Sequence, residues 1–221
     1  MNARLDIYKE VHKGLRKALF DLAFQAGSTD FTSADSLQRL KEQFDLTYNL
    51  LEVHAHSEDT FVEPLLKQCN VRMAEMLTAA HKELDATVSR LKQSLNDLNA
   101  GQADISDQGR SLYLGLTRFI SEYLKHIADE EQELMPLLWE NFDDEKLMEV
   151  TGTIRANVPP AVMANFLSLM IPAMNHGERA ELLIGMRQAT PCHVFDGVCQ
   201  LSQRVLSEQD WMRLDETVHA A

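Results

Sequence analysis

The chain is poor in the residues that mark β-rich and disulfide-rich proteins. Its 221 residues include six prolines, nine glycines and three cysteines. So few turn-forming residues argue against a sandwich or barrel of many short strands. The cysteines, Cys69, Cys192 and Cys199, are odd in number and form no C-x-x-C pair. A disulfide framework and a cysteine-based zinc site are therefore disfavoured, and we expect a cytoplasmic protein with reduced thiols.

Long apolar runs and a basic face are also missing. No stretch approaches the roughly 18 unbroken apolar residues of a transmembrane helix. Residues 1–6 lack the apolar core of a signal peptide. The 34 acidic residues outnumber the 21 basic ones, for a formal net charge of −13. Because phosphate binding needs a basic face, we expect no nucleic-acid partner, and because long apolar runs are missing we expect no membrane partner. A hydrophobic fraction of 45% excludes wholesale disorder.

Four successive segments carry apolar residues at alternating steps of three and four, which is the spacing of a helix face packed on a core. The four series run from Leu5 to Leu22, from Leu37 to Leu65, from Ala74 to Leu98, and from Leu112 to Leu137. Short connections make successive helices antiparallel neighbours. We therefore predict an all-α, up-down-up-down four-helix bundle over residues 1–140.

The apolar pattern loosens after residue 140. Pro159 and Pro160 predict a break, Asn175 a helix N-cap, and Pro191 the end of a segment. A further helix is expected over residues 194–206, and a last short helix begins near Trp211. We predict that residues 141–221 form a helical extension packed on the bundle and not an independent domain.

Six ionisable residues occupy core positions of the predicted bundle, near the middle of their helices: His12, His54, Glu58, His81, His126 and Glu130. Burying such groups is costly unless they pair or bind a metal. A single histidine on a helix seam is more often a hydrogen-bonded core residue. Chance, however, would place all four histidines on two-in-seven seam positions only about once in 150 cases. The set of four therefore favours a metal site.

The second and fourth segments also share a repeat, H-x3-E-[DE]-x4-P-L-L. It extends from His54 to Leu66 and from His126 to Leu138. The i, i+4 spacing puts each histidine and its glutamate on one helix face. Two helical hairpins of the same design, packed face to face, would each supply two histidines and one glutamate.

Four imidazoles and two carboxylates converging in a bundle interior suit two iron or manganese ions bridged by the carboxylates. Each ion would take two histidines and a share of both carboxylates, which leaves positions open for O2 or another small ligand. The imidazole-rich donor set argues against magnesium and calcium. We predict two non-haem iron ions, with manganese or zinc as alternative ions.

These residues resemble the hemerythrin-like, or HHE, cation-binding domains over roughly residues 5–140. The resemblance rests on the lone histidines of the first and third helices and on H-x3-E in the second and fourth. It implies that the six residues above are metal ligands and that Glu58 and Glu130 bridge the irons. Oxygen-carrying hemerythrins have H-x3-H in the third helix, whereas Asp85 stands four residues after His81 here. A solvated Asp85 is favoured over a replacement ligand, and simple reversible O2 carriage is disfavoured.

The C-terminal region is similar to the tail of the hemerythrin domains in plant iron-sensing RING-type ubiquitin ligases. The similarity rests on two short stretches, Ile171-Pro172-Ala173-Met174 and Arg187-Gln188-Ala189-Thr190. No RING or F-box is present in the sequence. The resemblance therefore implies that only a sensor-like module is shared.

Four residues near the predicted ligands have two interpretations each. Asp59 and Glu131 directly follow the two glutamates, and either hydrogen-bond a ligating histidine or remain solvated. Tyr8 and Tyr123 lie one turn before seam histidines, and either line a small-ligand pocket or fill the core. His56 is turned away from the seam and is expected at the surface.

Three functions are compatible with this pattern. We favour a metal-binding protein that takes up O2 or a related small oxidant as sensor, store or carrier, with no catalytic residues. A di-iron enzyme acting on peroxide or nitric oxide is the alternative. Ferritin-like oxidases carry E-x-x-H pairs rather than H-x3-E, so that fold is disfavoured. A metal-free interaction module is the third hypothesis, and both a homodimer and an unidentified protein partner fit the sequence.

Overall fold

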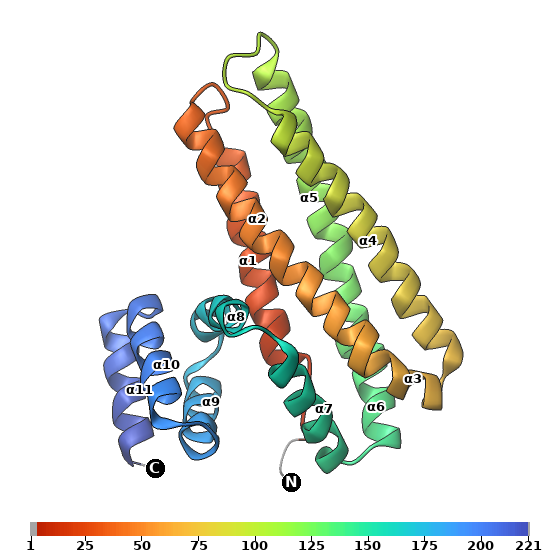
Figure 1. Ribbon diagram of the computed structural model, residues 1–221, viewed down its shortest axis with the longest axis vertical. Coiled ribbons are helices and arrows are strands. Elements are labelled where there is room, and N and C mark those ends of the chain that lie inside the picture. Colours follow the sequence, from red (N-terminus) through yellow and green to blue (C-terminus); the bar gives the residue numbers. More distant parts are fainter. Residues whose placement is uncertain (1–3, 221) are drawn as a thin grey trace. The chain divides into compact units, whose positions relative to one another are not determined.

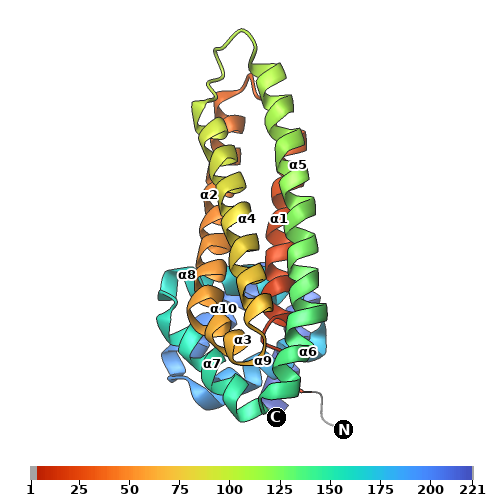
Figure 2. The ribbon, with the colours of Figure 1, turned by 90° about the vertical axis from the view of Figure 1, so that its right-hand side faces the viewer.

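The computed structural model describes residues 4–220, and every regular element in that range is a helix. Four long helices form a bundle: α1 (Lys9–Ser28), α2 (Ala34–Ser57), α4 (Val71–Asp97) and α5 (Ile105–Asp129). Figures 1 and 2 show α2, α4 and α5 side by side, with the chain reversing direction at each connection. The predicted all-α helical bundle followed by further helices is confirmed.

The chain forms two compact units. The first takes in the chain up to Lys9 and from Ala18 to Asn157, and the second takes in Glu10–Lys17 and the chain from Val158 onward. Helix α1 is continuous and contributes residues to both units. The division into a domain of residues 1–140 and an extension of residues 141–221 stays a prediction.

Local signals in the sequence explain where the bundle helices begin. Helix α2 starts after Ser33, whose hydroxyl accepts a hydrogen bond from the Ser36 N–H at 3.3 Å. Helix α4 starts after Asn70, whose side chain accepts from the Met73 N–H at 3.2 Å. Such caps satisfy backbone donors that have no partner inside the helix. Along the seams the apolar side chains are buried, including Leu40 and Phe44 of α2 and Leu116 of α5.

Both copies of the sequence repeat change to π-helix at the same point. Helix α2 continues into η1 (Glu58–Val62) and α3 (Glu63–Cys69), and α5 continues into η2 (Glu130–Leu134) and α6 (Met135–Asn141). Pro64 and Pro136 lie in the first turn of the helix that follows each π-helix. A proline ring clashes with the carbonyl four residues earlier in a regular α-helix, and a π turn relieves that clash. The repeat in the sequence is therefore a repeat in the backbone.

The segment before α1 is held against the end of the bundle within the first unit. The Arg4 guanidinium lies 2.6 Å from the Asp144 carboxylate, at the start of α7 (Asp144–Asn157). The indole N–H of Trp139 donates to the Leu5 carbonyl at 2.7 Å. These contacts set the point at which the chain enters α1, where Tyr8 joins the apolar core.

The second unit contains α8 (Pro160–Ala173), α9 (His176–Ala189), α10 (Cys192–Val205) and α11 (Glu208–Ala220). Its core includes Ile171, Leu183 and Leu214. Asn175 caps α9 as predicted, in a reciprocal capping box with Glu178. No single helix among residues 4–220 is long and apolar enough to cross a membrane, and only α7 and α8 taken together reach that length and composition.

Candidate metal centre

All six residues predicted as metal ligands lie in the interior. Their exposed fractions range from 0% for His12 to 9% for His126. The four histidines come from four different helices, α1, α2, α4 and α5, and the two glutamates are the first residues of η1 and η2. The helical seams therefore bring residues that are far apart in sequence to the same interior region.

Four of these residues form one cluster entirely within the first unit: Glu58, His81, His126 and Glu130. One potential ligand atom from each lies within 4.8 Å of the others. His81 Nε2 is 3.1 Å from Glu58 Oε2 and 3.6 Å from Glu130 Oε1. His126 Nε2 is 2.9 Å from Glu130 Oε1. The two imidazole rings meet edge to face, with centroids 4.9 Å apart.

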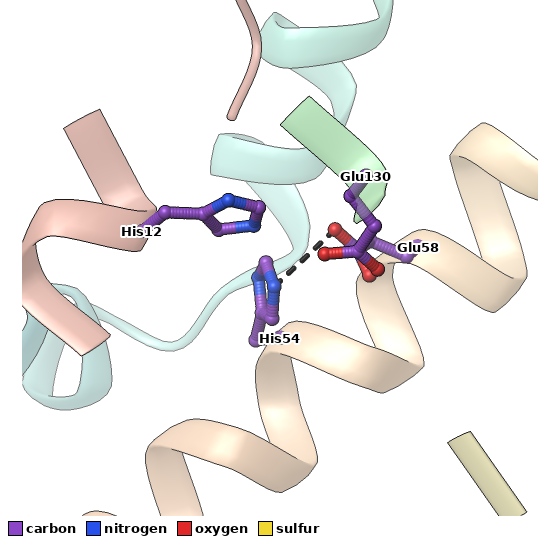
Figure 3. Close-up of side chains that lie close together, drawn as sticks. All are labelled: His12, His54, Glu58 and Glu130. Atoms are coloured by element: carbon purple, nitrogen blue, oxygen red, sulfur yellow. Dashed lines mark ion pairs between the residues drawn. The ribbon is translucent and has the colours of Figure 1, made fainter. Parts of the chain in front are cut away.

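A second cluster consists of His12, His54, Glu58 and Glu130, and its potential ligand atoms also lie within 4.8 Å of one another. Figure 3 shows the two imidazoles pointing toward the paired carboxylates. His54 Nε2 lies 3.3 Å from Glu58 Oε1. Glu58 and Glu130 belong to both clusters, which is the arrangement expected of carboxylates that bridge two ions.

The donor atoms fit a pair of transition-metal ions. They are imidazole nitrogens and carboxylate oxygens, the set that suits iron, manganese and zinc in proteins. The Nε2 atoms of His81 and His126 are fully buried, yet within the described chain they make no well-directed hydrogen bond. Buried polar atoms that converge without hydrogen bonding are costly unless a cation lies among them. The residues present therefore fit the metal centre that their pattern predicts.

The charge state of His81 shows how strongly the site favours a cation. Burial by itself lowers the pKa of His81, but polar contacts with the carboxylates of Glu130, Glu58 and Asp59 outweigh burial and raise it to about 11. In the metal-free protein this imidazole is therefore protonated at neutral pH. Its positive charge partly balances the two buried glutamates, a task that a metal ion would take over.

Tyr8 and Tyr123 adjoin the centre. Burial raises the pKa of both phenols, and the charges of Glu58 and Glu130 raise them further, so both hydroxyls keep their protons. The Tyr123 ring packs on His126 with centroids 5.7 Å apart. Among the residues that the structure describes, the buried Tyr123 hydroxyl has no hydrogen-bond partner.

Three residues near the centre, two aspartates and one histidine, lie outside both clusters. Asp85 is exposed and belongs to neither group, which supports the solvated interpretation. His56 is exposed, as predicted. Asp59, whose role the sequence left undecided, contacts His81 at 2.8 Å.

The π-helices were not predicted, although the prolines that follow each glutamate at a fixed distance were a visible signal of them.

The whole of residues 3–138 matches the family described as Hemerythrin HHE cation binding domain. The chain belongs to this family. Comparison with solved structures gave no significant match. The predicted resemblance is thus confirmed from the sequence side, and cation binding is the property that the family's description names.

Two plant proteins and one fish protein are similar to this chain over more than two thirds of its length. The chain is 24% identical over 195 residues to "Zinc finger protein BRUTUS-like At1g18910" of Arabidopsis thaliana, covering 86% of this chain and 16% of the relative. It is 24% identical over 183 residues to "Zinc finger protein BRUTUS-like At1g74770" of the same plant, covering 81% of this chain and 14% of the relative. It is 23% identical over 161 residues to "F-box/LRR-repeat protein 5" of Salmo salar, covering 69% and 21%.

The coverage of these matches has two consequences. The chain spans about a fifth or less of each relative's length. Residues 3–138 make up less than two thirds of the chain, so a match over 86% of it includes C-terminal helices. The similarity to these Arabidopsis proteins therefore extends into the C-terminal region, as predicted.

Proposed function

We propose that this chain binds two iron ions in a carboxylate-bridged, non-haem centre and takes up O2 or a related small oxidant as a sensor, store or carrier. One observation carries the proposal: four imidazoles and two carboxylates converge in the interior, and Glu58 and Glu130 are shared by both clusters. Family membership supports cation binding by the same region.

Each ion would be held by two histidines and by both shared glutamates. His12 and His54 would hold one, and His81 and His126 the other. Four protein donors leave an iron ion with open coordination positions, and iron bound in this way supplies a redox-active Lewis acid for small oxidants.

The chain's own residues limit access of water to this centre. Leu15, Leu51 and Leu84 lie one helical turn from His12, His54 and His81, and all three are buried. The buried phenols of Tyr8 and Tyr123, one turn before His12 and His126, add polar atoms beside the centre. An apolar interior of this kind would restrict access of water to the iron and so slow its autoxidation.

A binding role is favoured over an enzymatic one. Asp85 replaces the fifth imidazole of the oxygen carriers and is exposed, so the donor set differs from theirs at one position. The region forms a small part of relatives named for a zinc finger and for F-box and leucine-rich repeats. Such proteins combine several regions, which favours a regulatory module that responds to metal or oxidant.

The test is metal analysis of protein produced with supplementary iron. We expect about two irons per chain and a visible absorption band that changes on exposure to O2. His54→Ala should lower the iron content, whereas His56→Ala, which removes an exposed histidine two residues away, should not. Well under one transition-metal ion per wild-type chain would contradict the proposal and favour the metal-free interaction module.

A second assay separates binding from catalysis. Iron-loaded protein is mixed with hydrogen peroxide or nitric oxide under steady-state conditions, with free iron at the same concentration as the reference. Consumption no faster than that of free iron supports the binding role. Sustained turnover well above it would favour the di-iron enzyme.

A further inference from the structure

The two nitrogens of the buried His81 ring are contacted by carboxylates from consecutive residues of another helix. Asp59 Oδ1 lies 2.8 Å from His81 Nδ1, and Glu58 Oε2 lies 3.1 Å from His81 Nε2. Glu58 and Asp59 open η1, whereas His81 belongs to α4. The first two residues of η1 therefore contact both nitrogens of one imidazole on α4.

The two carboxylates differ in their surroundings. The Glu58 side chain is buried with the other predicted ligands, whereas 40% of the Asp59 side chain is exposed. Asp59 is in neither potential metal cluster. Its carboxylate therefore lies behind the imidazole, on the side away from the centre, and acts on the metal only through His81.

The contact with Asp59 decides which nitrogen of His81 can bind a metal. A carboxylate only accepts hydrogen bonds, so His81 Nδ1 carries the hydrogen in this pair. The imidazole, protonated in the metal-free protein, must lose one proton to bind a metal ion, and the neutral ring then has one protonated nitrogen and one with a free lone pair. With the hydrogen on Nδ1, the lone pair is on Nε2, the atom that faces Glu58 and Glu130.

We propose that Asp59 is a positioning residue of the metal centre, which holds His81 in the orientation and tautomer that present Nε2 to a metal ion. This inference rests on the proposed metal-binding function and adds a residue to it. Carboxylates behind ligating histidines typically change metal affinity by about 10- to 100-fold. His81 occurs in only one of the two clusters, so Asp59 acts mainly on the ion shared with His126.

The test titrates metal-free protein with Zn2+ in competition with a coloured chelator. The wild type is expected to bind two ions. Asp59→Asn should weaken one of them about 10- to 100-fold and leave the other within about threefold. Asp59→Glu, which keeps a negatively charged carboxylate where Asp59→Asn leaves only a neutral amide, should recover most of the affinity. Asp85→Asn is the matched control, since it removes an exposed carboxylate one turn after His81, and it should change neither ion by more than about threefold.

Nuclear magnetic resonance of the wild-type protein with Zn2+ bound reports the protonation state of each His81 nitrogen directly. Because it uses no variant, misfolding of a variant does not affect the result. The nitrogen shifts of His81 should show a protonated Nδ1 and a metal-bound Nε2. A protonated Nε2 would overturn the inference, whatever the fate of Asp59→Asn.

The titration separates this inference from the proposed function. If His81→Gln weakens zinc binding and Asp59→Asn does not, the role of Asp59 is wrong and the metal centre stands. If the wild type binds no zinc, or His81→Gln binds it unchanged, the metal centre itself is wrong.

Discussion

Glu58 and Glu130 are equivalent residues of a repeated structure: each lies four residues after a buried histidine and each begins a π-helix. Both reach the same interior region, and both belong to the two potential metal clusters. A histidine, by contrast, belongs to only one cluster. This difference in sharing leads to different expectations for substitutions of glutamate and of histidine.

Glu58→Gln should weaken the binding of both metal ions, by at least about tenfold each, or about 1.4 kcal/mol. The reason is that an amide is a weaker ligand than a carboxylate and Glu58 serves both clusters. His54→Gln should weaken mainly one ion, since His54 occurs in one cluster. Zinc titration of each metal-free variant measures the affinities of both ions. Glu133→Gln, which changes an exposed residue near Glu130, is the control. If Glu58→Gln and His54→Gln each weaken the same single ion, Glu58 does not bridge two ions.

Removing metal should lower the melting temperature. A ligand present at 100 times its dissociation constant stabilises the folded state by about 2.7 kcal/mol, which corresponds to roughly 5–10 °C for a chain of this size. Differential scanning calorimetry with and without a chelator gives the difference. The His56→Ala variant should show the same shift as the wild type. Identical melting with and without chelator would remove the main support for a buried metal site.

The metal-free protein should lose stability as the pH rises above neutrality. The pKa of His81 is raised from an ordinary value of 6.5 to about 11 in the folded state. A raised pKa means that the protonated form stabilises the fold. That contribution is complete below pH 6.5 and declines as the pH rises toward 11. Urea unfolding from pH 6 to pH 10 should show this decline in the wild type and a shallower one in His81→Gln. The exposed His56→Gln should follow the wild type.

Tyr123→Phe should leave the stability of the metal-free protein unchanged or slightly higher. The Tyr123 hydroxyl is buried and has no hydrogen-bond partner among the described residues. Replacing an unsatisfied buried polar group by an apolar one of the same shape removes a desolvation cost. Thermal and urea unfolding measure the change. A loss of more than about 1 kcal/mol would show that the hydroxyl has a stabilising partner in solution.

Much of the centre could be predicted from the sequence because burial along a helix is periodic. A side chain's place on its own helix follows from its spacing to apolar neighbours. This spacing alone predicted that four histidines are interior residues: His12, His54, His81 and His126. The i, i+4 spacing placed Glu58 beside His54 and Glu130 beside His126 in the same way. None of these placements needed knowledge of how two helices face each other.

Contacts between residues of different helices could not be predicted from the sequence and are known only from the tertiary structure. The meeting of Asp59 with His81 joins residues of η1 and α4 and requires a particular rotation and offset of the two helices. The two glutamates each begin a π-helix, a local change of backbone that the helical periodicity of the sequence did not predict.

The sequence by itself determined which faces of the four helices are interior and which ionisable residues they carry, because a helix repeats every 3.6 residues. Only the tertiary structure decided which carboxylate faces an imidazole of another helix, and that Asp59 contacts a histidine while Asp85 faces solvent. The physical reason is that periodicity specifies the direction of a side chain about its own axis. Its partner is specified by the packing of separate helices.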